Sequence, residues 1–472
     1  MPTIDSVLQR AASSAPDRTA VREWGGLEMT YAQLDAAVSS FAAWARAKGV
    51  REDDAIAVHL PSTAAFLIAQ LGSSRAGAVA AYINYRLMPN EARRQFSMCK
   101  ARVVVTTPDK AAEFVDDPQF SETLFVVDGE AEGRLTGLQD IIEANHRTDF
   151  RPEGREDSDA IIRFTSGSTG APKGLIVTHR AWLIRAQAMQ AETMQVQEGS
   201  TTLLLGQLSH QAGLFVIPTL LARATVLLMP KFSLDAVAEI LSTQQVSCAQ
   251  IVPTMFTLLL EHPRARAAAT ASGVKRIIYG GSPIRPAVLE EAMSVFPDTE
   301  FVQAYGSHEG GSISFLDSIA HRDPKLRHGA GVAYLPAQVR LHAPGPDGVG
   351  EIVDGHLFLR DRMNDVIISG GFNVYPMEVE QVVCGHPQVL DAAITSAPDD
   401  KWGERVVAFV VPRNAGVFDE ESVREHCRSL LAGYKVPKEF RLIPEMPLNP
   451  NGKPDRRALG DSLWAGRARR IN

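Results

Sequence analysis

The stretch from Thr165 to Gly174 reads TSGSTGAPKG and follows an apolar, strand-like run, AIIRF. It combines glycines, hydroxyl side chains and one lysine, and it offers almost nothing to bury. Glycines placed after a strand let backbone N–H groups approach a ligand closely, and phosphate is the commonest such ligand. Lys173 adds a cation, while Pro172 limits mobility. We therefore expect an anion-binding loop here and not a flexible surface linker.

Two familiar phosphate motifs do not fit this stretch. A P-loop counted from Gly167 needs a second glycine where Pro172 stands and a hydroxyl where Gly174 stands. The dinucleotide fingerprint G-x-G-x-x-G fails as well, because Ser168 and Thr169 follow Gly167. The loop predicts an anion site of another kind.

Bulk composition narrows the class of protein. A chain of 472 residues with 45% hydrophobic and 22% charged residues is typical of a globular protein of roughly two to four domains. The net charge of −7 gives no basic footprint for nucleic acid. No segment has the apolar length of a membrane span or a signal peptide. The cysteines lie far apart, at Cys99, Cys248, Cys384 and Cys427. We expect a cytoplasmic protein with reduced thiols that binds neither nucleic acid nor membrane.

Helix-like and strand-like patterns alternate along most of the chain. Strand-like runs at 55–60, 78–83 and 102–107 are separated by helix-like segments at 63–76 and 90–100. Such alternation predicts parallel sheets in layered α/β units. Thr30 and Gln33 form a capping-box pattern that opens a further helix. From about Gly329 the pattern changes to short strands with Pro/Gly turns, which predicts a small β subdomain, and a last unit starts near Met363.

Five segments, in this order, resemble the motifs of the adenylate-forming (ANL) superfamily of acyl-CoA synthetases, peptide-synthetase adenylation domains and luciferases. They are TSGSTGAPKG (165–174), YGGSP (279–283), QAYGSHEGG (303–311), LRDRMNDVIISGGFNVYPMEVE (359–380) and PNGKPDRR (450–457). A sixth segment, PDDKWGERVVAFVV (398–411), is most similar to acyl-CoA synthetases. The resemblance covers nearly the whole chain.

The resemblance implies a large N-terminal domain over 1–362, with two layered α/β sheets and a small β subdomain. It implies a small, mobile α+β C-terminal domain over 363–472 that rotates between two half-reactions. ATP and Mg²⁺ would activate a small-molecule carboxylic acid as an acyl-adenylate, and CoA would be the usual acceptor. The chain would act as a monomer or homodimer.

The same resemblance assigns roles to individual residues. The nucleotide would be bound by Thr165, Ser166, Gly167, Ser168, Thr169, Gly170, Lys173, Gly280, Gly281, Ser282, Pro283, Ala304, Tyr305, Gly306, Ser307 and His308. Glu309 would hold Mg²⁺, which spreads the developing charge of the leaving group. Lys453 would reach both the acid and the α-phosphate, and Arg362 would contact ribose or phosphate. His210 resembles the aromatic gate beside the acyl carboxylate.

The substrate can be narrowed by one absence. Peptide-synthetase domains carry an aspartate that pairs with the α-amino group, whereas QLSHQAGLF (207–215) has no acidic residue. An α-amino acid is therefore not expected. Small neighbours, among them Ala212 and Gly213, suit a short or aromatic acyl group.

Three departures from the family pattern keep other functions open. His308 stands where the motif has threonine, and Asn364 stands where the hinge carries Asp or Lys. The segment GEIVDGHLFLRDR (350–362) also lacks the stretch that holds the family's ribose-binding aspartate, with Asp354 the nearest upstream carboxylate. The alternatives are transfer to a carrier protein or an amine, a diazotase that activates nitrite toward an arylamine, and a degenerate nucleotide-binding protein without activity.

Overall fold

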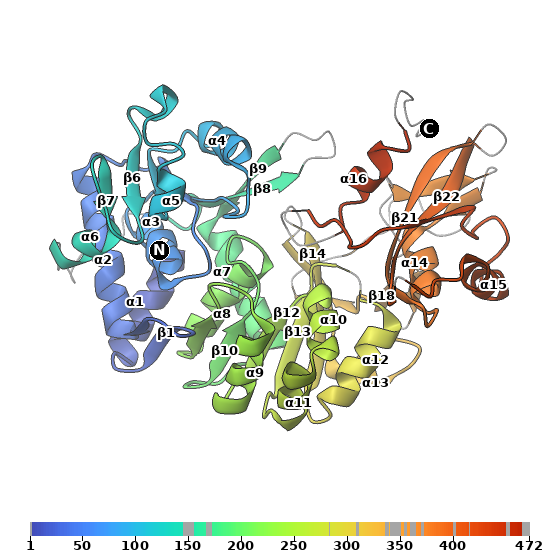
Figure 1. Cartoon of the computed structure of the whole chain (residues 1–472). Helices are drawn as coiled ribbons and strands as arrows, with labels where there is room; N and C mark the ends of the chain where they lie inside the picture. Colours follow the sequence, from blue (N-terminus) through green and yellow to red (C-terminus); the bar gives the residue numbers. More distant parts are fainter. Residues whose placement is uncertain are drawn as a thin grey trace. The chain divides into compact units, whose positions relative to one another are not determined.

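The structure is a computed structural model, and it falls into two compact units (Figure 1). It describes residues 2–144, 155–166, 172–282, 284–307, 311–335, 339, 351–353, 356–358, 365–369, 372–399, 403–414, 416–449 and 454–464. The first unit comprises Met1–Pro283 and Glu291–Arg340, and the second comprises Ile284–Glu290 and Leu341–Asn472. Each unit is described by itself.

The larger sheet of the first unit has, in the described part of the chain, nine strands in the order β16-β15-β14-β13-β12-β10-β11-β1-β2. Their bounds are β1 Thr19–Glu23, β2 Glu28–Thr30, β10 Thr201–Leu204, β11 Thr225–Leu228, β12 Cys248–Ile251, β13 Arg276–Gly280, β14 Glu300–Ser307, β15 Gly311–Leu316 and β16 Val332–Ala333. The six neighbouring strands β14, β13, β12, β10, β11 and β1 pair in parallel. Strand β2 at one edge, and β15 and β16 at the other, pair antiparallel. Strands β11 and β12 are buried throughout and β10 at all but its first residue, as expected of parallel strands covered on both faces.

The second sheet of this unit orders seven described strands as β7-β6-β5-β3-β4-β8-β9. Their bounds are β3 Ala55–Val58, β4 Val79–Tyr82, β5 Val103–Thr106, β6 Leu124–Val127, β7 Leu135–Gly137, β8 Asp159–Ser166 and β9 Pro172–Thr178. All neighbours are parallel except β8 and β9, which form an antiparallel hairpin. The expected layered α/β sheets are therefore confirmed, and the phosphate-loop stretch connects the two strands of this hairpin.

Helices of the first unit bury their apolar faces against these sheets. They are α1 Ile4–Ser14, α2 Tyr31–Ala47, α3 Ala64–Arg75, α4 Pro89–Met98, α5 Pro108–Ala111, η1 Pro118–Phe120, α6 Leu138–Ala144, α7 His179–Ala188, η2 Met189–Met194, η3 Gln211–Phe215, α8 Val216–Leu221, α9 Leu234–Thr243, α10 Pro253–Glu261, α11 Pro263–Ala271 and α13 Ser318–Arg322. One hydrophobic core contains residues of α1, α2, α3, α7 and α8 together with strands of both sheets. The capping box at Thr30 and Gln33 is confirmed at the start of α2. Among the described helices, none is both long and apolar enough to cross a membrane.

The second unit is an α+β structure, as expected. Its described strands follow the order β20-β19-β22-β21, with β23 parallel to β22 and the other pairs antiparallel. The elements are β19 Ile367–Ser369, β20 Phe372–Val374, α14 Pro376–Cys384, β21 Val389–Asp399, β22 Gly403–Pro412, α15 Glu420–Leu430, β23 Glu439–Leu442 and α16 Arg456–Asp461. A separate hairpin pairs β17 Glu351–Val353 with β18 His356–Phe358. Helix α12 (Pro286–Val295) has residues in both units.

Candidate functional site

The β8–β9 hairpin brings the two ends of the phosphate-loop stretch together. Thr165 pairs with Lys173 and Ser166 with Pro172, so the stretch between them closes the hairpin. The side chain of Lys173 is exposed. The loop residues Gly167, Ser168, Thr169 and Gly170 lie outside the described residues. The hairpin fixes where the loop begins and ends.

Two further sequence motifs meet at the carboxyl ends of neighbouring parallel strands. Gly280 ends β13 and lies opposite Ala304 of β14. A Cβ atom at Gly280 would stand 2.1 Å from the carbonyl oxygen of Ala304, so no other residue fits there. Ligands of parallel α/β sheets bind outside the carboxyl ends of the strands. The close backbone approach at Gly280 therefore lies at the edge where a ligand of such a sheet is expected.

Strand β14 continues into a second tight approach, with β15. Gly306 pairs with Ser312 and Ser307 with Gly311, and in the sequence the motif's histidine and glutamate lie between these pairs. A Cβ at Gly306 would lie 2.1 Å from the carbonyl oxygen of Gly311. The glycines of the YGGSP and QAYGSHEGG segments thus permit three strands to approach closely at one edge of the sheet.

His210 is held by a residue that the sequence analysis did not select. The side-chain amide of Asn84 lies 3.0 Å from Nε2 of His210. The other end of that amide, Oδ1, accepts a hydrogen bond from the backbone N–H of Arg86, so its nitrogen faces the histidine. Nε2 therefore accepts a hydrogen bond and carries no proton. The contact with Asn84 orients the His210 ring.

Buried glutamines near this edge have amide atoms without partners. Gln250 of β12 is fully buried, and neither of its amide atoms is bonded in the part of the chain that the structure describes. Oε1 of Gln211 is likewise buried and unbonded there. Cβ atoms added at Gly280 and Gly281 would lie 2.8 and 2.7 Å from the Gln211 amide. Buried amides normally find partners, so these groups suit hydrogen bonds to a bound ligand. A glutamine inside the apolar run CAQI was the available sequence signal.

A cavity of about 460 Å³ lies elsewhere in the first unit, against α1, α7 and α8. Val7, Leu183 and Leu220 are among its lining residues, and none of the residues selected from the sequence is. Two of its three arginines, Arg180 and Arg223, are already paired with carboxylates. This cavity is therefore not where the sequence motifs converge.

Several predicted site residues lie outside the described residues. They are Pro283, His308, Glu309, Arg362 and Lys453, together with Asp354 and Asn364 of the departing segments. The side chains of Thr165 and Ser166 are also not described. The described residues contain no group of three acidic, histidine or cysteine side chains that could hold a metal ion. The roles assigned to the residues outside the described part of the chain remain predictions.

Comparison with known proteins decides the family. The AMP-binding enzyme family matches residues 8–361, and the AMP-binding enzyme C-terminal domain matches residues 378–453. The chain belongs to the AMP-binding enzyme family. It is an ATP-dependent, AMP-forming ligase of the adenylate-forming superfamily, as the resemblance indicated.

Relatives in this family differ in the acid and in the acceptor. The chain is 32% identical to the feruloyl-CoA synthase of Amycolatopsis sp., over 94% of the chain and 96% of the relative. It is 28% identical to the fatty acid–[acyl-carrier-protein] ligase ScoC of Streptomyces coeruleorubidus, over 95% and 94%. The solved amide bond synthetase McbA of Marinactinospora thermotolerans superposes with a TM-score of 0.84 at 23% identity, over 98% of this chain and 100% of that one. This last likeness supports the fold alone.

Proposed function

We propose that this ligase activates a carboxylic acid other than an α-amino acid and transfers the acyl group to the thiol of CoA. The observation that carries the proposal is the close approach of β13, β14 and β15 at Gly280 and Gly306. It leaves a polar ligand room to lie along the backbone at the carboxyl edge of a parallel sheet. The glycine-rich hairpin connection after β8 supplies a second place for phosphate.

In the first half-reaction a carboxylate oxygen of the acid attacks the α-phosphorus of ATP. The bond from that phosphorus to the bridging oxygen breaks, and pyrophosphate leaves with its electron pair. Lys453 brings the two anions together by neutralising both. Glu309 would hold Mg²⁺, and the metal charge supplied there would offset charge on the leaving group. His210, oriented by Asn84, borders the attacking carboxylate.

In the second half-reaction the CoA sulfur, as thiolate, attacks the acyl carbon and AMP leaves. We assign the rotation between the two reactions to residues 363–472, with the hinge at Arg362. Each half-reaction then uses the same acyl site with a different face of the smaller domain.

The acid is small or aromatic and carries a hydrogen-bonding group. The buried amides of Gln211 and Gln250 support this choice, because an alkyl chain would leave them without partners. A relative that acts as a feruloyl-CoA synthase supports an aromatic acid. A carrier protein or an amine is the second candidate acceptor, favoured by the carrier-protein ligase among the relatives.

A pyrophosphate-release screen tests the proposal. Aromatic and short aliphatic acids, with nitrite as a further arm, are offered with ATP and Mg²⁺, and each with and without CoA. We expect release with a substituted aromatic acid and formation of its thioester when CoA is present. Release with nitrite alone would replace the proposal with diazotase chemistry, and no release with any arm would favour a nucleotide-binding protein without activity.

A further inference from the structure

Two arginines of the first unit are buried around one tryptophan. Arg163 lies on β8 and is 2% exposed, and Arg185 lies on α7 and is half-buried. Their guanidinium carbons stand 5.9 and 5.5 Å from the ring centre of Trp182, which α7 also carries. Tyr82 of β4 packs edge-on against the same tryptophan, with ring centres 6.3 Å apart. Two cations therefore share one aromatic side chain.

Neither guanidinium has a carboxylate partner within the described residues. Nε and Nη2 of Arg163, and Nη1 of Arg185, are buried without a hydrogen bond there. Burial and the charge of Arg185 lower the pKa of Arg163 to about 10, so it still carries its charge at neutral pH. Burial likewise lowers the pKa of Arg185. A buried charge without a partner is strongly destabilising, so these two cations, one fully and one partly buried, suit an anionic ligand.

The other unsatisfied groups of this cluster also point to an anion. Nε1 of Trp182 can only donate a hydrogen bond, and the hydroxyl of Tyr82 can donate one. Both are buried and unbonded in the same described part of the chain. A cluster that holds several free donors and two positive charges suits a ligand with many acceptor oxygens and more than one negative charge.

The position of the cluster relates it to the sequence motifs. Arg163 lies on the strand that ends at Ser166, where the phosphate-loop stretch begins. The guanidinium of Arg185 lies against Gly311, the first residue of β15, and a Cβ there would stand 2.5 Å from Nη2. The pair thus links the strand that enters the phosphate loop to the hairpin of β14 and β15.

We propose that Arg163 and Arg185 bind the β- and γ-phosphates of ATP and stabilise pyrophosphate as it leaves. This inference rests on the proposed adenylation only for the role of the leaving group, since nucleotide binding can be measured without an acid. A polyphosphate has enough acceptor oxygens and negative charges to pair with both guanidinium groups, whereas a single carboxylate would satisfy one guanidinium. Donors placed before the reaction at a position where charge develops lower its barrier.

The test compares ligands that share or lack the outer phosphates. Equilibrium affinities of the full chain for ATP, AMP and inorganic tripolyphosphate are measured with Mg²⁺ and without acid, for wild type, Arg163→Met and Arg185→Gln. We expect both variants to bind ATP and tripolyphosphate about tenfold more weakly or worse, and AMP within about twofold. Arg180→Met is the matched control, because Arg180 lies on the same helix, is exposed and pairs with Glu156. It should bind all three ligands as wild type does.

Thermal unfolding without nucleotide separates binding from structure. Arg163→Met removes an unpartnered buried charge, so its melting temperature should equal or exceed that of wild type. Arg185→Lys should recover part of the tripolyphosphate affinity that Arg185→Gln loses. Unchanged ATP affinity in both variants, or equal weakening of ATP and AMP, would overturn the inference. So would a loss confined to turnover of acids with a second carboxylate, which would move the pair to the acid site. ATP binding by wild type without pyrophosphate release from any acid would instead contradict the proposed function, and it would leave standing the binding of the outer phosphates by the two arginines.

Discussion

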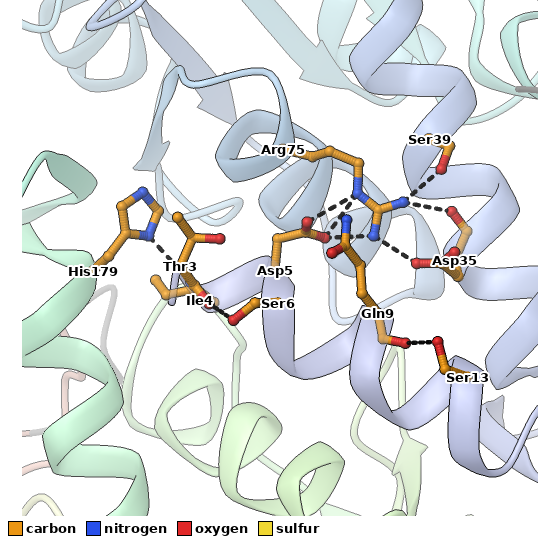
Figure 2. A network of polar contacts seen from close by, with 10 residues as sticks. All are labelled: Thr3, Ile4, Asp5, Ser6, Gln9, Ser13, Asp35, Ser39, Arg75 and His179. Atoms are coloured by element: carbon orange, nitrogen blue, oxygen red, sulfur yellow. Dashed lines mark hydrogen bonds and ion pairs between the residues drawn. The ribbon is translucent and has the colours of Figure 1, made fainter. Parts of the chain in front are cut away.

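Arg75 and Asp5 form an ion pair that is almost completely buried, with Nη2 of Arg75 2.6 Å from Oδ1 of Asp5 and the side chains 1% and 0% exposed. Figure 2 shows Arg75, the last residue of α3, between Asp5 of α1 and two residues of α2. The same guanidinium donates to Oδ1 of Asp35 at 2.6 Å and to Oγ of Ser39 at 2.5 Å. One side chain therefore joins three helices of the first unit.

Arg75→Met should destabilise the protein by about 3 kcal/mol, because removing one partner of a buried pair leaves an uncompensated charge. The measurement is urea unfolding at pH 7. Arg22→Met is the control, since Arg22 and Glu28 form a partly exposed pair between β1 and β2 whose loss should cost under about 1 kcal/mol. Equal losses in the two variants would show that burial does not strengthen the network.

The stability of this unit should also depend on the protonation of Asp5. Burial raises the pKa of Asp5 to about 6, although Arg75 opposes the rise. The folded state then binds a proton more tightly than the unfolded state, so this contribution is complete below about pH 4 and is lost as the pH rises through 6. Asp5→Asn cannot titrate at this position. The free energy of unfolding of wild type, minus that of the variant, should therefore fall between pH 4.5 and 7.5.

A nearby histidine acts in the opposite direction, which is why the comparison uses a difference. His179 accepts a hydrogen bond from the backbone N–H of Ile4 through Nδ1, and burial lowers its pKa to about 4. It therefore adds stability as the pH rises from about 4 to the ordinary histidine value of 6.5, equally in wild type and in Asp5→Asn. A difference that stays constant from pH 4.5 to 7.5 would contradict the assignment to Asp5.

Asn84→Ala should slow pyrophosphate release by about tenfold, since His210 would lose the hydrogen bond that orients its ring. ATP affinity should change little, because the effect is on the acyl side of the site. The measurement is kcat and KM for the acid at saturating ATP. Asn90→Ala, an exposed change at the start of α4, is the control. A change in ATP affinity equal to the change in rate would place Asn84 elsewhere.

Gly280→Ala should cost about 3 kcal/mol of stability and weaken ATP binding, because the new methyl group would overlap the carbonyl oxygen of Ala304. Gly273→Ala is a matched control on the approach to the same strand, where nothing lies within 4 Å of the added Cβ. Chemical unfolding and ATP titration of both variants decide the matter. A stable Gly280→Ala variant with normal ATP affinity would mean that β13 and β14 can separate without consequence.

Local sequence patterns predicted most helices and strands, whereas they did not predict how distant strands pair. The cap of α2 at Thr30 follows from neighbouring residues, and it is found. The α+β class expected of the second unit is found, but the sequence did not specify that its long strands β21 and β22 pair antiparallel. Helix α1 was missed although Ile4, Val7 and Leu8 have helical spacing.

The polar partners could not be predicted for a physical reason. Arg75 and Asp5 are brought together only when α1 and α3 pack, and Asn84 and His210 only when loops from two sheets meet. Neither member of either pair differs locally from a solvated polar residue. Motif residues were recognisable because glycine and lysine at a fixed spacing form a local pattern that can be seen without knowing any distant side chain.

Lys453→Ala should abolish pyrophosphate release but spare thioester formation from supplied acyl-adenylate and CoA. The reason is that its charge is needed while two anions approach, and the second half-reaction starts from an adenylate that is already formed. The two activities are measured separately, by pyrophosphate release and by thioester appearance. Loss of a dominant electrostatic contact costs about a hundredfold or more in rate.

Lys438→Ala is the control for a general loss of positive charge in the same unit, because this lysine is exposed and its ammonium group donates to the backbone oxygen of Gly433. It should keep both activities. If Lys453→Ala lost both half-reactions equally, the smaller domain would be needed in one position only. If it lost neither, PNGKPDRR would be a surface segment. Loss of the first alone is the result that requires one site to serve two chemistries in turn.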